Sequence, residues 1–341
     1  MRALTKHQCL TATFKNWILL VAAVVLVLFN ASLAIASSGT LYITSNTTLT
    51  EDHYGNVVVK GNNITLDCAN HTISGPGVDE IYGGIEVYFG TGITVKRCKV
   101  TGFNDVNGIY AVGTTDSQYE GNTIFSNGAN GMHLDSGFGN QVIGNTVRSN
   151  AGNGIAITGS RQTLIEQNTV QDHKTGEGGI VVIGSDHNMV VANAASGNAN
   201  GFVFDGGVSN DLVNNTAYAN PGSGFLFIRS ANSNSAWLNS SNGNQYGFMV
   251  TESSNQNLLG SNTANKNQFE GFHIYSSNSN SLTGNIADGN GTYGFFVWGG
   301  SSYTVVNRNS GHKNSQFDAY QEATGTGNMW SHNWFGTIYG F

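Results

Sequence analysis

The stretch NGMHLDSGFGNQVIGNTVRSN, residues 130–150, is one copy of a unit that recurs along most of the chain. Each copy opens with a Gly, followed by an apolar residue, any residue and a second apolar residue. A turn rich in Gly, Ser and Asn comes next, and the copy closes with Asn-Thr-x-x-x-Asn or a near variant. The opening glycines are Gly84, Gly108, Gly131, Gly154, Gly179, Gly201, Gly224, Gly247, Gly271 and Gly294. Their spacing of 22 to 25 residues predicts a stacked repeat architecture.

Within a copy the apolar residues alternate with a period of two, as they do in strands. In the copy at Gly131, Met132 and Leu134 point the same way, Val142 lies in a second short strand, and Val147 lies in a third. Three short strands per copy, separated by turns, predict an all-β fold: a three-sided coil of parallel sheet with about ten to eleven rungs.

The side chains expected inside the coil compensate one another in size: where those of the first strand are larger, those of the third strand are smaller. From Gly201 onward the first inward position is always Phe, while the third-strand position shrinks to Ala in three copies. The phenylalanines are Phe202, Phe225, Phe248, Phe272 and Phe295, and the alanines are Ala217, Ala264 and Ala287. Such compensation keeps a narrow interior evenly filled, as close packing requires.

Two columns of asparagines recur at the turns, one with Asn122 and Asn145 and the other with Asn127 and Asn150. Asn tolerates turn conformations, and stacked Asn side chains can bond one another, so both columns are interpreted as scaffold. The second column is interrupted at Asp172-His173, in the longest copy.

The first 36 residues have the character of a secretory signal. Basic residues precede an apolar run from Trp17 to Phe29, and Ala34-Ile35-Ala36 has the small-x-small pattern of a cleavage site. The alternative is an uncleaved membrane anchor, but the run is short for a span. We therefore expect residues 1–36 to be a signal peptide, 37–83 an N-terminal cap and first rung, 84–314 the repeats, and 315–341 a C-terminal cap.

Removing residues 1–36 changes the formal net charge from −7 to −10, which argues against nucleic acid and, after cleavage, against membrane surfaces as partners. The expected location is secreted, periplasmic or at the cell surface.

Two cysteines, Cys68 and Cys98, remain in the chain after residue 36. A disulfide between neighbouring rungs and a pair of buried free thiols are both open, and neither Cys fits a metal-binding motif.

The repeat units, the segment ITLDCANHTISG and the closing WSHNWFGT resemble right-handed parallel β-helix proteins of the pectin lyase-like superfamily, in particular the periplasmic and secreted group that includes NosD. The resemblance covers nearly the whole chain after residue 36 and implies a single-stranded right-handed parallel β-helix. It implies little about activity, since the superfamily holds lyases, hydrolases, epimerases, adhesins and uncharacterised proteins.

Candidate chemistry lies in the two columns of first-strand residues that point outward. The first column is Glu86, Tyr110, His133, Ala156, Val181, Val203, Leu226, Met249, His273 and Phe296. The second column is Tyr88, Val112, Asp135, Thr158, Ile183, Asp205, Ile228, Thr251, Tyr275 and Trp298. Adjacent rungs lie about 4.8 Å apart, so successive members of a column are neighbours.

The first cluster consists of Glu86, Tyr110, His133 and Asp135, and it is our candidate for catalysis. A carboxylate, a phenol and an imidazole in contact can act as general acid and base on a glycosidic bond or on a proton beside a carboxylate. Three residues nearby are candidates for substrate binding. Tyr88 lies in the second column, as Asp135 does, and His173 and Lys174 lie in a loop expected along the same edge. The alternative is that these are ordinary polar residues on a solvated face.

The second cluster consists of His273, Tyr275, Phe296 and Trp298. Exposed aromatic rings can stack on sugars, so His273, Tyr275 and Trp298 are candidate substrate-binding residues. The alternative is that they pack against the aromatic tail of the chain.

Between the clusters lies an apolar stripe, which should be covered by a folded loop, a second copy or an apolar ligand. Its members are Val181, Ile183, Val203, Leu226, Ile228 and Met249.

These observations predict an exported carbohydrate-active protein that binds or cleaves a polysaccharide by a lyase, hydrolase or epimerase reaction. The DPHD motif of the alginate epimerases is absent from the sequence. No metal site or cofactor is predicted, although calcium stays open as a bridge to an anionic polymer. The alternatives are a non-catalytic binding or assembly protein that forms homo-oligomers through the apolar stripe, and a NosD-like accessory protein.

Overall fold

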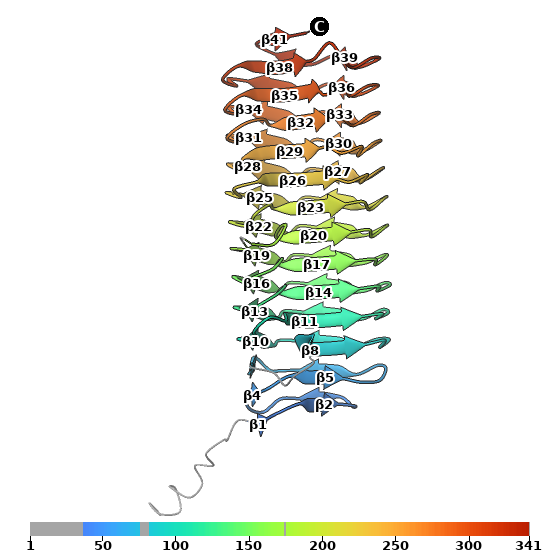
Figure 1. The fold of residues 1–341 in the computed structure, drawn as a ribbon, viewed down its shortest axis with the longest axis vertical. Coiled ribbons are helices and arrows are strands. Elements are labelled where there is room, and N and C mark those ends of the chain that lie inside the picture. Colours follow the sequence, from blue (N-terminus) through green and yellow to red (C-terminus); the bar gives the residue numbers. More distant parts are fainter. Residues whose placement is uncertain (1–36, 76–81, 174, 341) are drawn as a thin grey trace, which may run out of the picture. The chain divides into compact units, whose positions relative to one another are not determined.

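The computed structural model describes residues 37–75, 82–173 and 175–340. The predicted signal peptide and Lys174 lie outside these residues. In the described part of the chain every regular element is a strand, and 41 short strands form three parallel sheets. The chain visits the three sheets in turn and then repeats, so each circuit forms one rung, and the rungs stack on one another (Figure 1).

Sheet 1 contains the first strand of each copy. Its members, in order along the stack, are β2 (Leu41–Ile43), β5 (Val57–Val59), β8 (Gly83–Tyr88), β11 (Asn107–Val112), β14 (Met132–Asp135), β17 (Ile155–Thr158), β20 (Ile180–Ile183), β23 (Phe202–Asp205), β26 (Ser223–Ile228), β29 (Tyr246–Val250), β32 (Phe272–Tyr275), β35 (Tyr293–Trp298), β38 (Phe317–Gln321) and β41 (Ile338–Tyr339).

Sheet 2 contains the second strands. They are β3 (Thr47–Thr48), β6 (Thr65–Asp67), β9 (Thr94–Lys96), β12 (Gln118–Glu120), β15 (Gln141–Ile143), β18 (Leu164–Glu166), β21 (Met189–Val191), β24 (Asp211–Val213), β27 (Ser235–Trp237), β30 (Leu258–Gly260), β33 (Ser281–Thr283), β36 (Val305–Asn307) and β39 (Met329–Ser331).

Sheet 3 contains the third strands. They are β1 (Ser37–Ser38), β4 (His53–Tyr54), β7 (Thr72–Ser74), β10 (Lys99–Thr101), β13 (Thr123–Phe125), β16 (Thr146–Arg148), β19 (Thr169–Gln171), β22 (Ala194–Ser196), β25 (Thr216–Tyr218), β28 (Ser240–Asn242), β31 (Thr263–Asn265), β34 (Ile286–Asp288), β37 (Ser310–His312) and β40 (Trp334–Phe335).

The predicted all-β coil is confirmed, and its stack is slightly longer than the expected ten to eleven rungs. The three sheets hold 14, 13 and 14 strands. The additional strands come from both ends of the described chain, since residues 37–60 and 315–339 pair in parallel with their neighbours instead of folding across the ends. For example, β38 pairs with β35 and then with β41.

Aromatic stacking fills the interior of the later rungs. Successive rings from Phe202 through Phe225, Phe248 and Phe272 to Phe295 have centroid distances of 4.6 to 4.9 Å and lie within 7° of parallel. The small side chains predicted opposite them, such as Ala217 and Ala264, are fully buried. The expected compensation in side-chain size is therefore confirmed.

The asparagine columns form buried ladders, and in the second of them His173 takes the place of one Asn. The side-chain Nδ2 of Asn122 donates to Oδ1 of Asn145 and to the carbonyl of Val95, both at 3.0 Å. The backbone N–H of Asn122 donates to the same Oδ1 at 2.9 Å. Each side-chain amide therefore bonds buried backbone groups at a turn. Without a partner, these backbone groups would cost free energy on burial. This confirms the scaffold interpretation.

A third ladder was missed by the sequence analysis. Its members lie at the turn between sheets 1 and 2 and include Asn140, Asn188, Asn210, Asn234, Asn257, Asn280 and Asn328. The period of the repeat is present in these positions too, but Ser117, Thr163 and Thr304 interrupt the column.

His173 belongs to the second ladder, so the expectation that its side chain faces substrate is wrong. The imidazole is fully buried. Its backbone N–H donates to Oδ1 of Asn198, as an Asn in that place would. The ring nitrogens Nδ1 and Nε2 both lie 3.3 Å from backbone carbonyls, those of Asn150 and Val147. His173 is therefore part of the scaffold.

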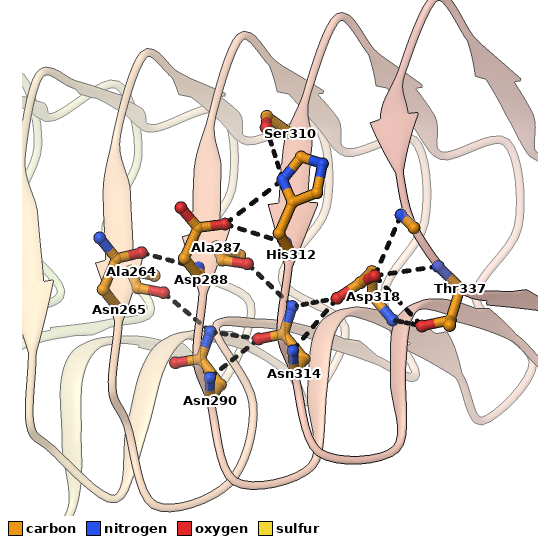
Figure 2. A network of polar contacts seen from close by, with 11 residues as sticks. Ala264, Asn265, Ala287, Asp288, Asn290, Ser310, His312, Asn314, Asp318 and Thr337 are labelled. Atoms are coloured by element: carbon orange, nitrogen blue, oxygen red, sulfur yellow. Dashed lines mark hydrogen bonds and ion pairs between the residues drawn. The ribbon is translucent and has the colours of Figure 1, made fainter.

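One bonded feature lies near each end of the described coil. Cys68 and Cys98 form a disulfide between adjacent rungs near the first strands, which resolves the alternative left open by the sequence. Near the last strands, the buried carboxylate of Asp318 accepts from Asn314 and Thr337 and ends the second ladder (Figure 2). Among the described residues there is no helix of sufficient length and apolarity to span a membrane.

Candidate functional site

The outer face of sheet 1 carries the first cluster, on three adjacent strands. The register aligns Glu86 of β8 with Tyr110 of β11, and Tyr110 with His133 of β14. Asp135 lies two residues beyond His133 on the same face. The structure thus brings together the four residues predicted for catalysis.

Glu86 is the buried member of the first cluster, with 4% of its surface exposed. Its Oε1 accepts from the backbone N–H of Tyr82 at 2.8 Å and from that of Gly83 at 3.3 Å. Its Oε2 accepts from the hydroxyl of Tyr88 at 2.7 Å. A carboxylate held by three donors at this depth orients its neighbours, and Tyr88 is the residue it orients most directly.

The half-buried members are Tyr110, His133 and Asp135. The rings of Tyr110 and His133 have centroids 5.5 Å apart. Burial raises the pKa of Tyr110, and the nearby Asp135 adds to this effect. Burial lowers the pKa of His133, although Asp135 opposes the shift. At neutral pH the pair therefore consists of a protonated phenol and a neutral imidazole, which are a proton donor and a proton acceptor.

Two further residues complete the surroundings of the first cluster, and the sequence analysis named neither as a site residue. Tyr82 is 60% exposed, and its ring centroid lies 5.5 Å from that of Tyr110. Thr158 of β17 places Oγ1 3.1 Å from Nε2 of His133. Thr158 was already in the second outward column, and Tyr82 was detectable as an aromatic residue directly before Gly83-Gly84.

The middle of the face is covered, as the sequence analysis expected of the apolar stripe. Val181 and Val203 are fully buried. The backbone of Gly178 lies so close to them that a Cβ at this position would be 2.9 Å from Cγ2 of Val203. Gly178 belongs to the extension that makes its copy the longest. A folded loop thus covers this part of the stripe, which was one of the three coverings considered.

An ion-paired bridge holds this loop in place. Arg229, directly after β26, pairs with Asp205 and also with Glu177, where the Nη2–Oε1 distance is 3.1 Å. Glu177 precedes β20 and Arg229 follows β26, so the bridge crosses the outer face of sheet 1. It separates the first cluster from the second.

The second cluster lies on β32 and β35, closer to the last strands. The register aligns His273 with Phe296 and Tyr275 with Trp298. Trp298 donates its indole N–H to Nε2 of His273 at 2.9 Å. On the other side of the imidazole, Nδ1 lies 3.4 Å from Oε2 of Glu270. The sequence analysis missed Glu270, which replaces the Asn found directly before the opening Gly of several other copies, such as Asn130 and Asn153.

The aromatic tail covers only part of the second cluster. Tyr320 contacts Phe296 at 5.1 Å between ring centroids, and Tyr339 in turn stacks on Tyr320. By contrast, the ring contacts of Trp298 are with His273, Tyr275 and Phe296. The predicted packing against the tail therefore applies to Phe296 and leaves Tyr275 and Trp298 each 36% exposed.

The described residues do not include a set of side chains arranged to bind a metal ion. Within the described ranges, no group of three or more His, Cys, Asp or Glu side chains is placed to hold a metal ion. The side chains of both clusters take part in hydrogen bonds and aromatic contacts.

Several solved structures resemble this one. The periplasmic alginate epimerase AlgG is 15% identical, with 89% of this chain and 77% of that chain covered and a TM-score of 0.52. The Dettilon tailspike protein is 15% identical, with 89% and 61% covered and a TM-score of 0.55. The catalytic unit of an α-1,3-glucanase from Streptomyces thermodiastaticus is 13% identical, with 92% and 66% covered and a TM-score of 0.50. At these identities the likeness concerns the fold.

A search of curated proteins finds no match to this sequence. A family model described as a right handed beta helix region matches residues 24–170 and 153–310, which together make up most of the chain. The protein therefore belongs to the right-handed β-helix family.

Proposed function

We propose that this protein is an exported, carbohydrate-active β-helix protein that binds or cleaves a polysaccharide on the outer face of sheet 1. The observation that carries the proposal is the contact between Tyr110 and His133, whose pKa shifts leave a protonated phenol beside a neutral imidazole. The structural neighbours include an alginate epimerase and an α-1,3-glucanase, which supports a carbohydrate as the partner.

In this proposal the members of the first cluster have different roles. His133 accepts a proton from the sugar or from an attacking water, and Tyr110 donates one to the departing oxygen or to the opposite face of the ring. Asp135, whose Oδ1 accepts from the hydroxyl of Ser136 at 2.7 Å, binds sugar hydroxyls at the edge of the site. Glu86 is a positioning residue, since its oxygens already accept from Tyr82, Gly83 and Tyr88.

Lyase, hydrolase and epimerase reactions all need an acid and a base on a sugar, so the first cluster is compatible with each. Export follows from the signal segment expected in residues 1–36 and agrees with a periplasmic neighbour. Lys174, Tyr88 and the second cluster remain proposed contacts for the polymer outside the reacting atoms.

The test is a panel of polysaccharides assayed for new reducing ends and for unsaturated or epimerised products. Tyr110→Phe, His133→Gln and Asp135→Asn are compared with Asp211→Asn, an exposed carboxylate on sheet 2 that serves as a matched control. Loss of one proton-transferring group should lower turnover by about 100-fold or more, and the control should leave it unchanged.

Two results would count against the catalytic proposal. Equal turnover in the wild type and in Tyr110→Phe and His133→Gln would remove these residues from the chemistry. Binding of a polysaccharide without any product would instead favour the alternative of a non-catalytic binding protein.

A further inference from the structure

Tyr275 and Trp298 form an exposed aromatic pair on the outer face of sheet 1, several rungs away from the first cluster. They occupy the same column on the adjacent strands β32 and β35. Their ring centroids are 5.1 Å apart, and the planes are tilted by 38°. Each residue keeps about a third of its surface exposed although the neighbouring Phe296 is covered by Tyr320.

A buried polar pair fixes the orientation of the Trp298 ring. Because an indole nitrogen can only donate, Nε2 of His273 is the acceptor in the 2.9 Å hydrogen bond. The proton of the neutral imidazole then resides on Nδ1, which faces Oε2 of Glu270 at 3.4 Å. This last contact is close but lacks hydrogen-bond geometry.

Glu270 is held from a second side, since its Oε1 accepts from the hydroxyl of Thr292 at 2.8 Å. Glu270 and His273 are both more than nine-tenths buried. Burying a carboxylate and an imidazole costs free energy unless they are paired. Such a pair beneath an exposed ring is more than the packing of an ordinary rung requires, because other rungs of sheet 1 place Ala156 or Val203 at the position of His273.

The surroundings of the aromatic pair carry no positive charge. The four rungs around it contribute residues 246–257, 269–280, 292–303 and 316–328 to sheet 1 and its following turn, and none of these residues is Lys or Arg. Their charged members, Glu252 and Glu322 included, are acidic. A polyuronate would therefore be repelled here, whereas a neutral sugar would meet apolar rings with hydrogen-bonding groups around them.

We propose that Tyr275 and Trp298 form a second glycan-binding site that takes a neutral polysaccharide, with His273 and Glu270 as positioning residues for the indole. The inference rests on the proposed function in one respect, namely that a glycan lies along the outer face of sheet 1. It requires no turnover and no contribution from the first cluster.

Affinity electrophoresis through gels that contain single polysaccharides tests the site. The panel holds neutral glucans, galactans and mannans on one side and alginate and polygalacturonate on the other. The wild type should be retarded by at least one neutral polymer, and Trp298→Ala should weaken this retention by about tenfold. Trp237→Ala is the matched control, because Trp237 is 39% exposed on sheet 2.

The positioning role has its own variants. His273→Ala and Glu270→Gln should each weaken retention by about threefold or more in gels run well below the midpoint of thermal unfolding of each variant. His273→Gln keeps an oxygen acceptor for the indole and should recover part of the loss. Glu252→Gln, an exposed carboxylate one rung away, should have no effect.

The outcomes separate this site from the proposed function. Retention that survives Trp298→Ala but is lost in Tyr110→Ala would overturn the second site and leave the first cluster in place. Failure of every neutral polymer to retard the wild type would overturn the second site whatever the turnover assays give. A dimer that Trp298→Ala dissociates, without any glycan retention, would identify the aromatic pair as a contact between copies and would also overturn the inference.

Discussion

Asn314 donates its side-chain N–H to Oδ1 of Asp318 at 2.8 Å, and this hydrogen bond is where the second asparagine ladder ends (Figure 2). The other carboxylate oxygen, Oδ2, accepts from the backbone N–H of Gly336 and from both the N–H and the hydroxyl of Thr337. Every group around this carboxylate is a donor. An aspartate suits the end of the ladder because, unlike Asn, it has no N–H of its own that would need a further acceptor.

The first prediction is that Asp318→Asn, a nearly isosteric change, destabilises the last rungs. The new NH₂ group would face N–H donors, so the variant should lose about 2–4 kcal/mol of local stability. Hydrogen exchange in β38, β40 and β41 measures it, because a repeat protein can unfold from one end. Asp288→Asn is the control, since Asp288 is about half exposed and its amide oxygen could still accept from His312. An equal effect of both changes would contradict the assignment.

The pH dependence of this effect has a definite sign. Burial opposes the charge of Asp318, but the hydrogen bonds from Asn314 and Thr337 outweigh it and hold the pKa of Asp318 below its usual value of 3.8. A lowered folded-state pKa means that the stabilisation is present above pH 3.8 and is lost as the pH falls through the folded-state pKa. The stability difference between the wild type and Asp318→Asn should therefore narrow in strong acid.

The second prediction is that His173→Asn makes the coil more resistant to acid. Burial lowers the pKa of His173 below 6.5, despite its contacts with the carbonyls of Val147 and Asn150. The unfolded chain then binds a proton that the folded chain resists, so stability is lost as the pH falls from 6.5 toward the folded-state pKa. An Asn would continue the ladder without a titrating group.

Thermal unfolding at pH 8 and pH 5 measures this effect. The midpoint of His173→Asn should exceed that of the wild type by more at pH 5 than at pH 8. His332→Asn, at an exposed position, should leave the pH dependence as it is. A variant that unfolds more readily than the wild type at both pH values would show that the larger imidazole is needed for packing.

The repeat itself is what made the fold predictable. A Gly at a period of 22 to 25 residues and two Asn columns are each repeated many times, so chance departures in single copies do not obscure the pattern. The same redundancy made His133 and Asp135 visible as departures from it. The inward residues Met132 and Leu134 were placed correctly because alternation fixes which side chains of a strand share a face.

The sequence could not show how deeply each outward side chain is buried or which segment covers it. Glu86 and Val181 both point outward, yet both are buried. Glu86 is buried because its oxygens accept from Tyr82 and Gly83, and Val181 because the extension around Gly178 folds over it. The period gives the length of an extension and not its direction. His173 was misjudged for a related reason, since a ladder position can accept a different side chain without a break in the backbone.

The third prediction concerns two of the three interruptions in the ladder between sheets 1 and 2, Thr163 and Thr304. Among the described residues, the buried hydroxyl oxygens of Thr163 and Thr304 have no hydrogen-bond partner. By the register of the column, an Asn at 163 would accept from the N–H of Asn140 and donate to Asn188. Thr163→Asn and Thr304→Asn should each raise the free energy of unfolding by about 1 kcal/mol.

The two sites are many rungs apart, so the double variant should show the sum of the single effects. Thr123→Asn, at a half-exposed position on sheet 3, controls for the change of residue type. Urea unfolding gives the comparison. A loss of stability in both single variants would mean that the column narrows at these rungs and has no room for the amide.

The fourth prediction concerns the bridge between Arg229, Asp205 and Glu177. Arg229→Ala removes the partner of Glu177 and should loosen the loop over Val181 and Val203. Arg229 and Glu177 are each about half exposed, so the loss of their ion pair should cost at most about 1 kcal/mol of stability. The larger effect should be a gain in binding of an apolar fluorescent dye, because two buried valines become accessible.

Arg308→Ala is the control for this prediction. It changes an exposed position on the far side of the repeat and should leave dye binding unchanged. If Arg229→Ala also leaves it unchanged, the loop is held by its backbone contacts alone, such as the hydrogen bond from Gly178 N–H to Oδ1 of Asn153 at 3.0 Å.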